Sequence, residues 1–233
     1  MSKERILRNH YREVVYPQEH WALLQTKRTE ALKLLSIFEE ELFKGYVYGS
    51  LARGDVHPNS DIDIGFLYKI PPFKIEYLLT KNNFKNYHRE IIAATPSDSI
   101  KLYIHLSELV SITVPLTPLT KKNREFYDFG GKIEHHQLQD NLRVPGITKQ
   151  LILIKPTEKG HVEKSIIHQE HIAAKTVGIS IATINERKKV LLRREKHGRT
   201  GVFLKRELAR DETVEGALKS IAEQNSIIRR KIR

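Results

Sequence analysis

Two aspartates and a glycine–serine pair lie close together in the first third of the chain, with the types and spacing that phosphate chemistry uses. Gly49 and Ser50 are followed by ten residues, and Asp61 and Asp63 come next, separated by one isoleucine. Residues two apart on a strand project from the same face, so we expect the two carboxylates to lie side by side. Adjacent carboxylates are costly unless a cation neutralises them, and Mg²⁺ prefers oxygen ligands. The pair therefore predicts a site for Mg²⁺ or Mn²⁺.

The glycine–serine pair has the properties of a phosphate-binding turn. A glycine lets the backbone approach a phosphate closely, and Ser50 has both a hydroxyl and a backbone amide to donate. The free amides at the start of a short helix present a positive end to a triphosphate. Arg53 lies one turn further along, where it could reach a phosphate. Gly49, Ser50 and Arg53 are therefore the expected nucleotide-binding residues.

These residues need two strands and a supporting helix to position them. Apolar residues at helical spacing predict a helix over residues 19–43, and a short strand over residues 46–48 follows it. The aspartates open a second strand over residues 61–68, whose isoleucines and phenylalanine alternate with them and face a core. Two further strands are expected over residues 89–95 and 99–106.

The segment 46–66 resembles the nucleotidyltransferase superfamily of DNA polymerase β, and its small stand-alone members in particular. The resemblance lies in Gly49-Ser50-Leu51-Ala52-Arg53-Gly54-Asp55 and in Asn59-Ser60-Asp61-Ile62-Asp63. It implies a mixed sheet with helices on one face. It also implies Mg²⁺-dependent transfer of a nucleoside monophosphate from a nucleoside triphosphate, with release of pyrophosphate.

The same resemblance implies a third carboxylate on a later strand, as a metal ligand or general base. The strand expected over residues 99–106 has Lys101, Tyr103 and His105 opposite its apolar face, and no acid. Glu108 follows this strand directly. His105 and Glu108 are therefore the two candidates for the catalytic base, with Glu90 and Asp98 as further possibilities.

The C-terminal part has the spacing of a helix-turn-helix. Ala174, Gly178 and Ile184 provide a close helix crossing, a turn and a core residue, and Ser180 is placed to cap the second helix. The segment resembles bacterial and archaeal helix-turn-helix domains, although an arginine stands at position 187 where those domains more often have an apolar residue. Residues 197–201 are expected at the tip of a wing hairpin. The expected nucleic-acid contacts are Thr183, Arg187, Lys188, Arg193, Arg194 and Arg199.

Composition limits the classes of partner and compartment. The net charge of +12 favours a polyanion such as nucleic acid. The absence of cysteine excludes disulfides, thiolate metal sites and cysteine nucleophiles. No apolar run is long enough to cross a bilayer, and the N-terminal residues are charged without an apolar stretch, so we expect a cytoplasmic protein without a membrane partner. The histidines at 135, 136, 168 and 171 lack a supporting ligand pattern and are interpreted as non-metal residues.

The sequence thus predicts an α+β protein in four parts. These are an N-terminal arm (1–18), a nucleotidyltransferase domain (19–118), a connecting region (119–163) and a basic, mainly α, winged helix-turn-helix-like domain (164–233). The leading function is metal-dependent transfer of a nucleoside monophosphate to a hydroxyl of RNA, protein or a small molecule. The alternative is a nucleic-acid-binding regulator whose nucleotidyltransferase fold senses nucleotide or is inactive. A separate helical protein partner is a third possibility.

Overall fold

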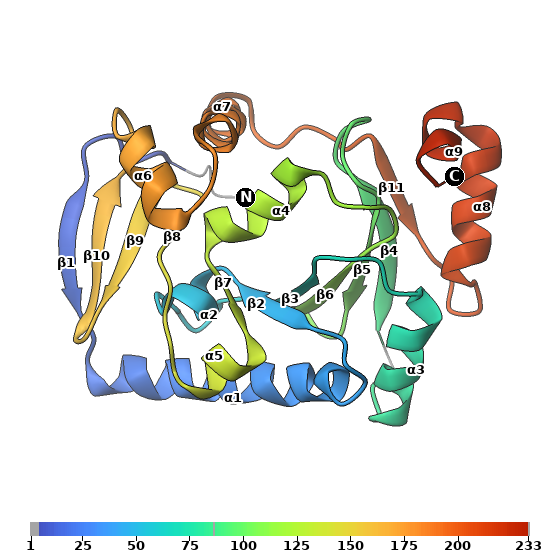
Figure 1. Cartoon of the computed structure of the whole chain (residues 1–233), viewed down its shortest axis with the longest axis horizontal. Coiled ribbons are helices and arrows are strands. Elements are labelled where there is room, and N and C mark those ends of the chain that lie inside the picture. The colour runs from blue at the N-terminus through green and yellow to red at the C-terminus, as the bar shows by residue number, and fades with distance from the viewer. Residues whose placement is uncertain (1–4, 86, 233) are drawn as a thin grey trace.

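The computed structural model describes residues 5–85 and 87–232, which form two β-sheets with helices packed around them (Figure 1). The larger sheet is mixed: β3 and β6 run parallel, and its other neighbouring strands run antiparallel. In spatial order its strands are β11 (Leu204–Glu207), β4 (His88–Ala93), β5 (Lys101–His105), β6 (Val110–Pro115), β3 (Ile62–Phe66), β2 (Gly45–Tyr48) and β7 (Lys132–Glu134). The predicted α+β class is confirmed.

One face of the larger sheet is apolar and fully buried. Ile64, Ile112 and Ile104 stand opposite one another on three adjacent strands, and all three have no exposed surface. This face packs against helices at the bottom and right of Figure 1. They are α1 (Gln18–Glu39), α3 (Pro72–Lys81), α5 (His135–Gln139), α8 (Val214–Gln224) and α9 (Ser226–Ile232).

Helix α1 follows its predicted apolar stripe closely and lies against the strands that carry the glycine–serine pair and the aspartates. Leu35 and Phe38 are fully buried, and the Phe38 and Phe66 rings meet edge to face with 5.3 Å between centroids. A Cβ on Gly45 would come within 2.8 Å of the Leu35 side chain. A side chain at position 45 would therefore force the Leu35 side chain to move.

The opposite face of the larger sheet carries the polar residues, and α4 (Lys121–Gly130) lies across it with α7 (Ile181–His197) beyond (Figure 1). Thr120 caps α4 by accepting a hydrogen bond from the Asn123 amide. A Cβ on Gly65 would stand 2.7 Å from the Tyr127 ring, so the absence of a side chain there lets α4 pack directly on β3. Helices therefore cover both the apolar face and the polar face of the sheet.

A smaller antiparallel sheet lies to the left in Figure 1. Its order is β1 (Tyr11–Val15), β10 (Gly160–Ser165), β9 (Ile152–Thr157) and β8 (Gly146–Ile147). No strand was expected in the N-terminal arm (1–18), yet β1 lies within it. That strand pairs along its whole length with β10, which is remote in sequence and supplies the hydrogen bonds.

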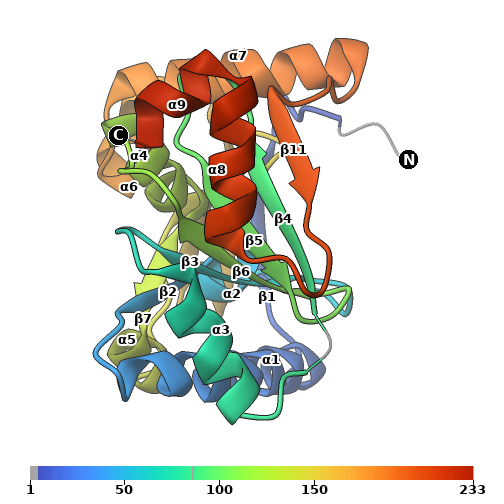
Figure 2. The same ribbon diagram turned by 90° about the vertical axis from the view of Figure 1, so that its right-hand side faces the viewer.

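The helical pair of the C-terminal part has the predicted local geometry. Helix α6 (Glu170–Val177) ends at Gly178, which has the left-handed φ of 71°, and Ser180 caps α7 by accepting from the Thr183 amide. Ile184 is fully buried between the helices and the rest of the molecule. Figure 2 shows α7 lying across the top of the molecule. Two helices joined by a turn at Gly178 therefore lie where the sequence predicted them, while a helix-turn-helix domain that binds nucleic acid stays a prediction.

The expected wing hairpin at residues 197–201 is wrong. Helix α7 continues to His197, and the chain then runs to β11, which pairs antiparallel with β4 of the larger sheet. An unpaired strand edge is a strong hydrogen-bonding template, and β4 offers that edge to β11. The expected boundaries at residues 118 and 164 stay predictions, although β7 and β11 both extend the larger sheet.

In the part of the chain that the structure describes, no helix has the length and apolar character needed to cross a membrane.

Candidate active site on the polar face of the larger sheet

A row of polar side chains crosses the larger sheet on the face opposite the apolar core. Asp63 on β3 stands opposite Ser111 on β6, Ser111 stands opposite His105 on β5, and His105 stands opposite His88 on β4. Residues paired across neighbouring strands share a face. The sheet therefore brings together, on one surface, a metal-ligand candidate and a base candidate that are far apart in the sequence.

The glycine–serine turn lies directly beside this row. Tyr48, the last residue of β2, pairs with Asp63, so Gly49 and the short helix α2 (Ser50–Arg53) begin next to that carboxylate. Gly49 has a φ of 85°, which disfavours any residue with a side chain. Apart from Gly49 itself and its two chain neighbours, no described residue has an atom within 4 Å of the position a Cβ would take on Gly49. The turn is thus open where a phosphate would approach its backbone.

The two aspartates differ in environment. Asp61 precedes β3 and is exposed, whereas Asp63 lies inside the strand and is half-buried. Burial raises the pKa of Asp63, the hydrogen bond that Ser111 Oγ donates at 2.6 Å opposes that shift, and the Asp61 charge adds to it. The charges of Lys149 and His105 act in the opposite direction and lower the pKa of Asp63. A hard divalent cation fits this donor set.

Ser111 is a site residue that the sequence did not reveal. It lies on the strand next to β3, directly opposite Asp63, where a carboxylate would share a metal with the aspartates. Strand β6 continues through Pro115. A strand can end in proline, because the missing amide proton then costs no hydrogen bond between the strands. Strand β6 carries no acid, so a serine occupies the position opposite Asp63.

His105 belongs to the row and is held by an acid. Its Nε2 lies 3.0 Å from Glu90 Oε1, and Glu90 is almost fully buried. Burial acts to raise the pKa of Glu90, but hydrogen bonds from Lys205 and His105 leave it below its usual value, so the carboxylate is ionised. A carboxylate only accepts, so Nε2 carries the proton of a neutral His105 and Nδ1 is left as the acceptor.

Glu108, the other base candidate, lies in the exposed turn between β5 and β6. The turn touches the aspartate strand through its backbone: the Ile62 amide donates to the Leu109 carbonyl at 2.7 Å. The backbone at Glu108 is therefore near the start of β3, and Glu108 is not one of the paired residues of the row that begins at Asp63.

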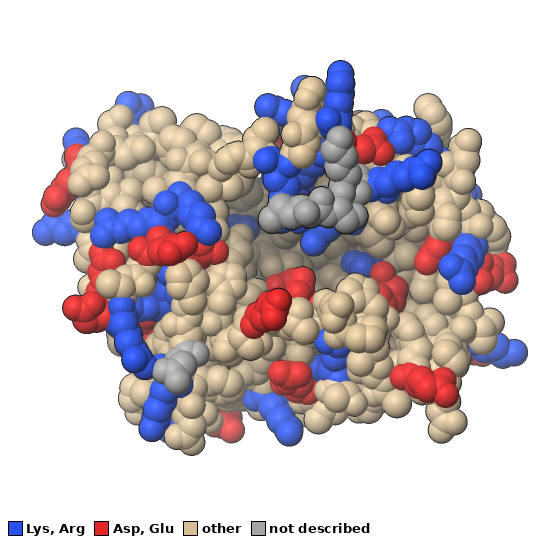
Figure 3. All heavy atoms as spheres, turned by 180° about the vertical axis from the view of Figure 1, so that it is seen from behind, with Lys and Arg blue, Asp and Glu red and all other residues tan. Residues whose placement is uncertain are grey.

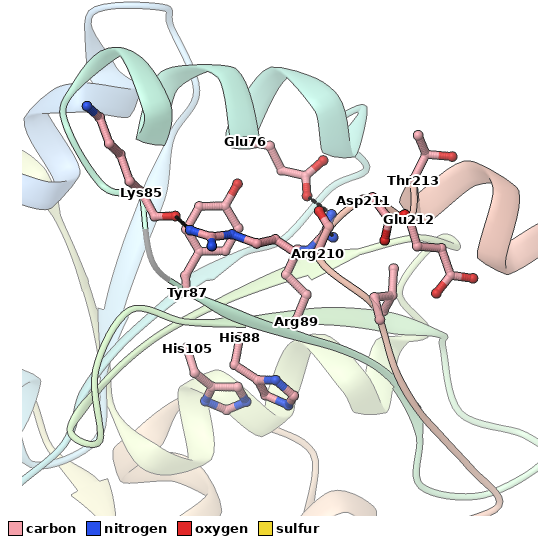
Figure 4. Close-up of a pocket in the computed structure, with 11 residues that line it drawn as sticks. Glu76, Lys85, Tyr87, His88, Arg89, His105, Arg210, Asp211, Glu212 and Thr213 are labelled. Carbon is pink, nitrogen blue, oxygen red and sulfur yellow. Dashed lines mark hydrogen bonds and ion pairs between the residues drawn. The ribbon is translucent and has the colours of Figure 1, made fainter.

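A pocket of about 750 Å³ opens at the ends of β4, β5 and β11, next to His105. His88 and His105 lie side by side there, with 5.9 Å between ring centroids, and on the other side of β4 from Arg89 and Tyr87 (Figure 4). The remaining lining residues are Glu76, Lys85, Leu208, Arg210, Asp211, Glu212 and Thr213. The pocket is lined by both charge signs and borders the base candidate.

The Arg53 guanidinium makes contacts within the protein, and its expected contact with a phosphate stays a prediction. It donates to both carboxylate oxygens of Asp55 at 2.9 Å and to the Gly130 carbonyl at 2.6 Å, and the residue is 6% exposed. The Gly49 amide is also engaged, because it donates to the Gly131 carbonyl at 2.9 Å. Arg53 therefore holds the turn against the end of α4, a role that the sequence did not indicate.

Basic side chains of α1 hold the same turn from the other side. The buried Arg28 donates to the Leu51 carbonyl at 2.8 Å and to the Ala52 carbonyl at 3.4 Å. Lys27 donates at 2.8 Å to the carbonyl of Ser60, the residue before Asp61. Two adjacent residues of one helix thus position both halves of the site.

Two of the expected nucleic-acid contacts are instead packed against α4. Thr183 is 2% exposed and its hydroxyl donates to the Glu125 carboxylate. The Arg187 guanidinium lies over the Phe126 and Phe129 rings, at 5.0 and 5.7 Å from their centroids. Thr183 is therefore closed to a ligand, and Arg187 is committed to an intramolecular contact, because the first turns of α7 rest on α4.

The rest of the predicted basic set is more open. Arg193 and Arg199 are exposed, Arg194 is half-buried, and Lys188 pairs with Glu170 at 2.5 Å. Viewed from behind, the molecule has a central hollow below α7, with Lys and Arg gathered above it and Asp and Glu below it (Figure 3). Basic side chains therefore border a hollow that a polyanion could enter.

Residues 32–173 match the family model of the nucleotidyltransferase domain, which covers more than half of the chain. The chain belongs to the nucleotidyltransferase domain family. The match includes the glycine–serine turn, both aspartates, Ser111 and His105, and it ends within α6. It leaves α7, β11, α8 and α9 outside. No curated protein and no solved structure gives a significant match.

Proposed function

We propose that the chain transfers a nucleoside monophosphate from a nucleoside triphosphate to a hydroxyl acceptor, with pyrophosphate as the leaving group. The observation that carries this proposal is the pairing of Tyr48 with Asp63, which sets the open Gly49–Ser50 turn beside the carboxylate pair. A triphosphate bound at the turn would have its phosphates next to these carboxylates. Asp61 and Asp63 would hold Mg²⁺ or Mn²⁺, and the bound cation would neutralise charge on the phosphates.

The chain's own groups have separate tasks in this reaction. We expect Ser50 to donate its amide and its hydroxyl to the triphosphate. The Gly49 amide is not available for this contact, because it donates to the Gly131 carbonyl. The acceptor oxygen forms a bond to the α-phosphorus while the bond from that phosphorus to pyrophosphate breaks. The proton of the acceptor hydroxyl goes to Nδ1 of His105, whose Nε2–H is held by Glu90. Glu90 thereby acts as a positioning residue for His105.

The test is transfer of an α-labelled nucleotide by the full chain, supplied in turn with each of the four nucleoside triphosphates, Mg²⁺ or Mn²⁺, and RNA or protein acceptors. Asp61→Asn and Asp63→Asn should each abolish transfer with the fold intact, because each removes an anionic ligand. Asp140→Asn, at an exposed position after α5, is the matched control and should keep full activity. Robust transfer by the Asp61→Asn/Asp63→Asn double variant would refute the proposal.

A second function is favoured by one observation, the serine at the position opposite Asp63. Without a carboxylate there, the fold would sense nucleotide while α7 and the following loop bind nucleic acid. The exposed Arg193 and Arg199 are the groups we expect to contact phosphates. The full chain should then bind duplex DNA or structured RNA with an affinity that falls steeply with salt. Arg193→Gln should reduce that salt slope, and salt-independent binding would contradict this function.

A further inference from the structure

A cluster of histidine and glutamate lies at the β4–β11 edge of the larger sheet, away from the aspartates. His88 and Glu90 are two apart on β4 and share its polar face, and Glu207 on β11 stands directly opposite Glu90. One ligand atom of each residue lies within 4.8 Å of the other two. An imidazole nitrogen and two carboxylate oxygens are thus gathered by strand pairing alone.

The electrostatics of the cluster call for a cation. Like charges directly opposite each other on neighbouring strands destabilise a sheet, and the Glu90 side chain is about nine-tenths buried. The Lys205 ammonium lies 2.9 Å from Glu90 Oε2 and 3.8 Å from Glu207 Oε1. Lys205 is half-exposed, and its side chain is long enough to move into solvent. The two glutamates therefore already attract one positive charge, that of the Lys205 ammonium, and this ammonium can move away into solvent.

We propose that His88, Glu90 and Glu207 bind a divalent transition-metal cation of the Zn²⁺ type, which displaces the Lys205 ammonium. A mixed set of one imidazole and two carboxylates suits Zn²⁺, whereas Mg²⁺ and Ca²⁺ prefer oxygen ligands alone. Two of the three side chains, His88 and Glu207, are exposed, so a cation has a path from solvent. Water would complete the coordination.

This site is separate from the metal expected at the aspartates. Strands β6 and β5 lie between β3, which carries Asp63, and β4. Three steps of about 4.8 Å put the two sites roughly 14 Å apart. Paired catalytic ions lie only about 3.5–4 Å apart. The proposed cation instead joins β11 to β4, and so fastens the chain after α7 to the family domain.

The test uses the full chain with Asp61→Asn and Asp63→Asn, so that the site expected on β3 cannot contribute, and Co²⁺ as a spectroscopic substitute for Zn²⁺. We expect one Co²⁺ per chain, with d–d absorption of a nitrogen- and oxygen-ligated ion. His88→Ala and Glu207→Gln should each weaken Co²⁺ binding at least tenfold. Lys205→Met should strengthen it, because the competing ammonium is gone. His136→Ala, an exposed histidine that pairs with Glu134 elsewhere, is the matched control and should bind as the parent does.

Thermal unfolding gives a second measurement that does not depend on the spectrum. Zn²⁺ should raise the Tm of the parent and of the His136→Ala variant, and it should leave the Tm of the His88→Ala variant unchanged. Circular dichroism checks that the His88→Ala variant is folded, as expected for an exposed side chain. The proposal is overturned if no Co²⁺ is retained, or if His88→Ala and Glu207→Gln bind Co²⁺ as tightly as the parent. Neither result bears on nucleotidyl transfer, because the aspartates are absent from every protein tested.

Discussion

Replacing Ser111 with aspartate tests whether the position opposite Asp63 is the place for a third carboxylate. In the native chain Ser111 Oγ donates to Asp63 Oδ1 at 2.6 Å. Ser111→Asp removes that donor and puts a second negative charge on the neighbouring strand, about 4.8 Å away. Ser111→Asn is the matched control, because it has nearly the same shape, keeps an N–H donor and adds no charge.

The expected cost follows from the distance between the two charges. At about 5 Å and an effective dielectric constant of about 20, two unit charges repel by roughly 3 kcal/mol. In metal-free buffer at neutral pH, Ser111→Asp should therefore be less stable than Ser111→Asn by about 3 kcal/mol. For a chain of this size that difference corresponds to a Tm lower by about 6–12 °C. The gap should narrow as the pH falls through the carboxyl range, because one carboxylate then takes a proton.

Mg²⁺ should close the stability gap between the two variants. A cation shared by three carboxylates removes the repulsion, so in millimolar Mg²⁺ the Tm of Ser111→Asp should rise more than that of Ser111→Asn. Transfer by Ser111→Asp should also exceed that of the native chain if the added carboxylate serves as ligand or base, by a factor on the order of ten to a hundred. Equal metal-free stability of the two variants would refute the placement of residue 111 beside Asp63. If Mg²⁺ does not change the Tm of Ser111→Asp, the proposed metal site is refuted.

Three further substitutions test other parts of the structure. His105→Gln should lower the rate of the chemical step by a factor on the order of a hundred and leave nucleotide binding intact, whereas Glu108→Gln should have little effect. Single-turnover kinetics measures this rate. The reverse result would make Glu108 the base. Arg28→Met should lower the unfolding free energy by about 3 kcal/mol in urea titrations, because it leaves buried carbonyls without donors, and Arg28→Lys should recover part of the loss. Glu125→Gln should destabilise the chain at neutral pH: burial acts to raise the Glu125 pKa, but hydrogen bonds from Ser180 and its neighbours keep it below its ordinary value of 4.5. The stabilisation from ionised Glu125 is present above pH 4.5 and is lost as the pH falls through the lowered pKa, so Tm measured against pH should show the two proteins converging in acid.

Local pattern was sufficient for the elements that carry the glycine–serine turn and the aspartates. Helix α1, β2 and β3 each have a periodicity that their own residues determine, and the turn between β2 and α2 needs the glycine that the sequence places there. The spacing of Gly49, Ser50, Asp61 and Asp63 therefore predicted the centre of the site. It did not predict that Asp61 would stay outside the strand and exposed.

Long-range pairing explains what the sequence did not reveal. Strand β1 is stabilised by β10 and β11 by β4, and neither partner is close in sequence. Ser111 became visible only once β6 was placed beside β3 in register, because a serine between two apolar residues carries no signal of its own. Thr183 was expected on an exposed helix face, yet the packing of α7 on α4 buries it. The periodicity of a sequence predicts which residues lie on the same face of a helix or strand. It does not predict which other element packs on that face.

The geometry of the proposed site depends on residues outside the part that matches the family. Lys27 and Arg28 precede residue 32, where the match begins, and their side chains hold the carbonyls of Ser60, Leu51 and Ala52. The last carbonyls of a helix have no partners within the helix. Helix α2 is so short that these carbonyls lie close to its N-terminal end, which faces the phosphate. Cations from α1 satisfy these carbonyls on the buried side, so the amides at the other end of α2 stay directed at the open turn. The first half of α1 is therefore part of the site: a fragment that begins at residue 32 should keep the glycine–serine pair and the aspartates and still lose their relative placement.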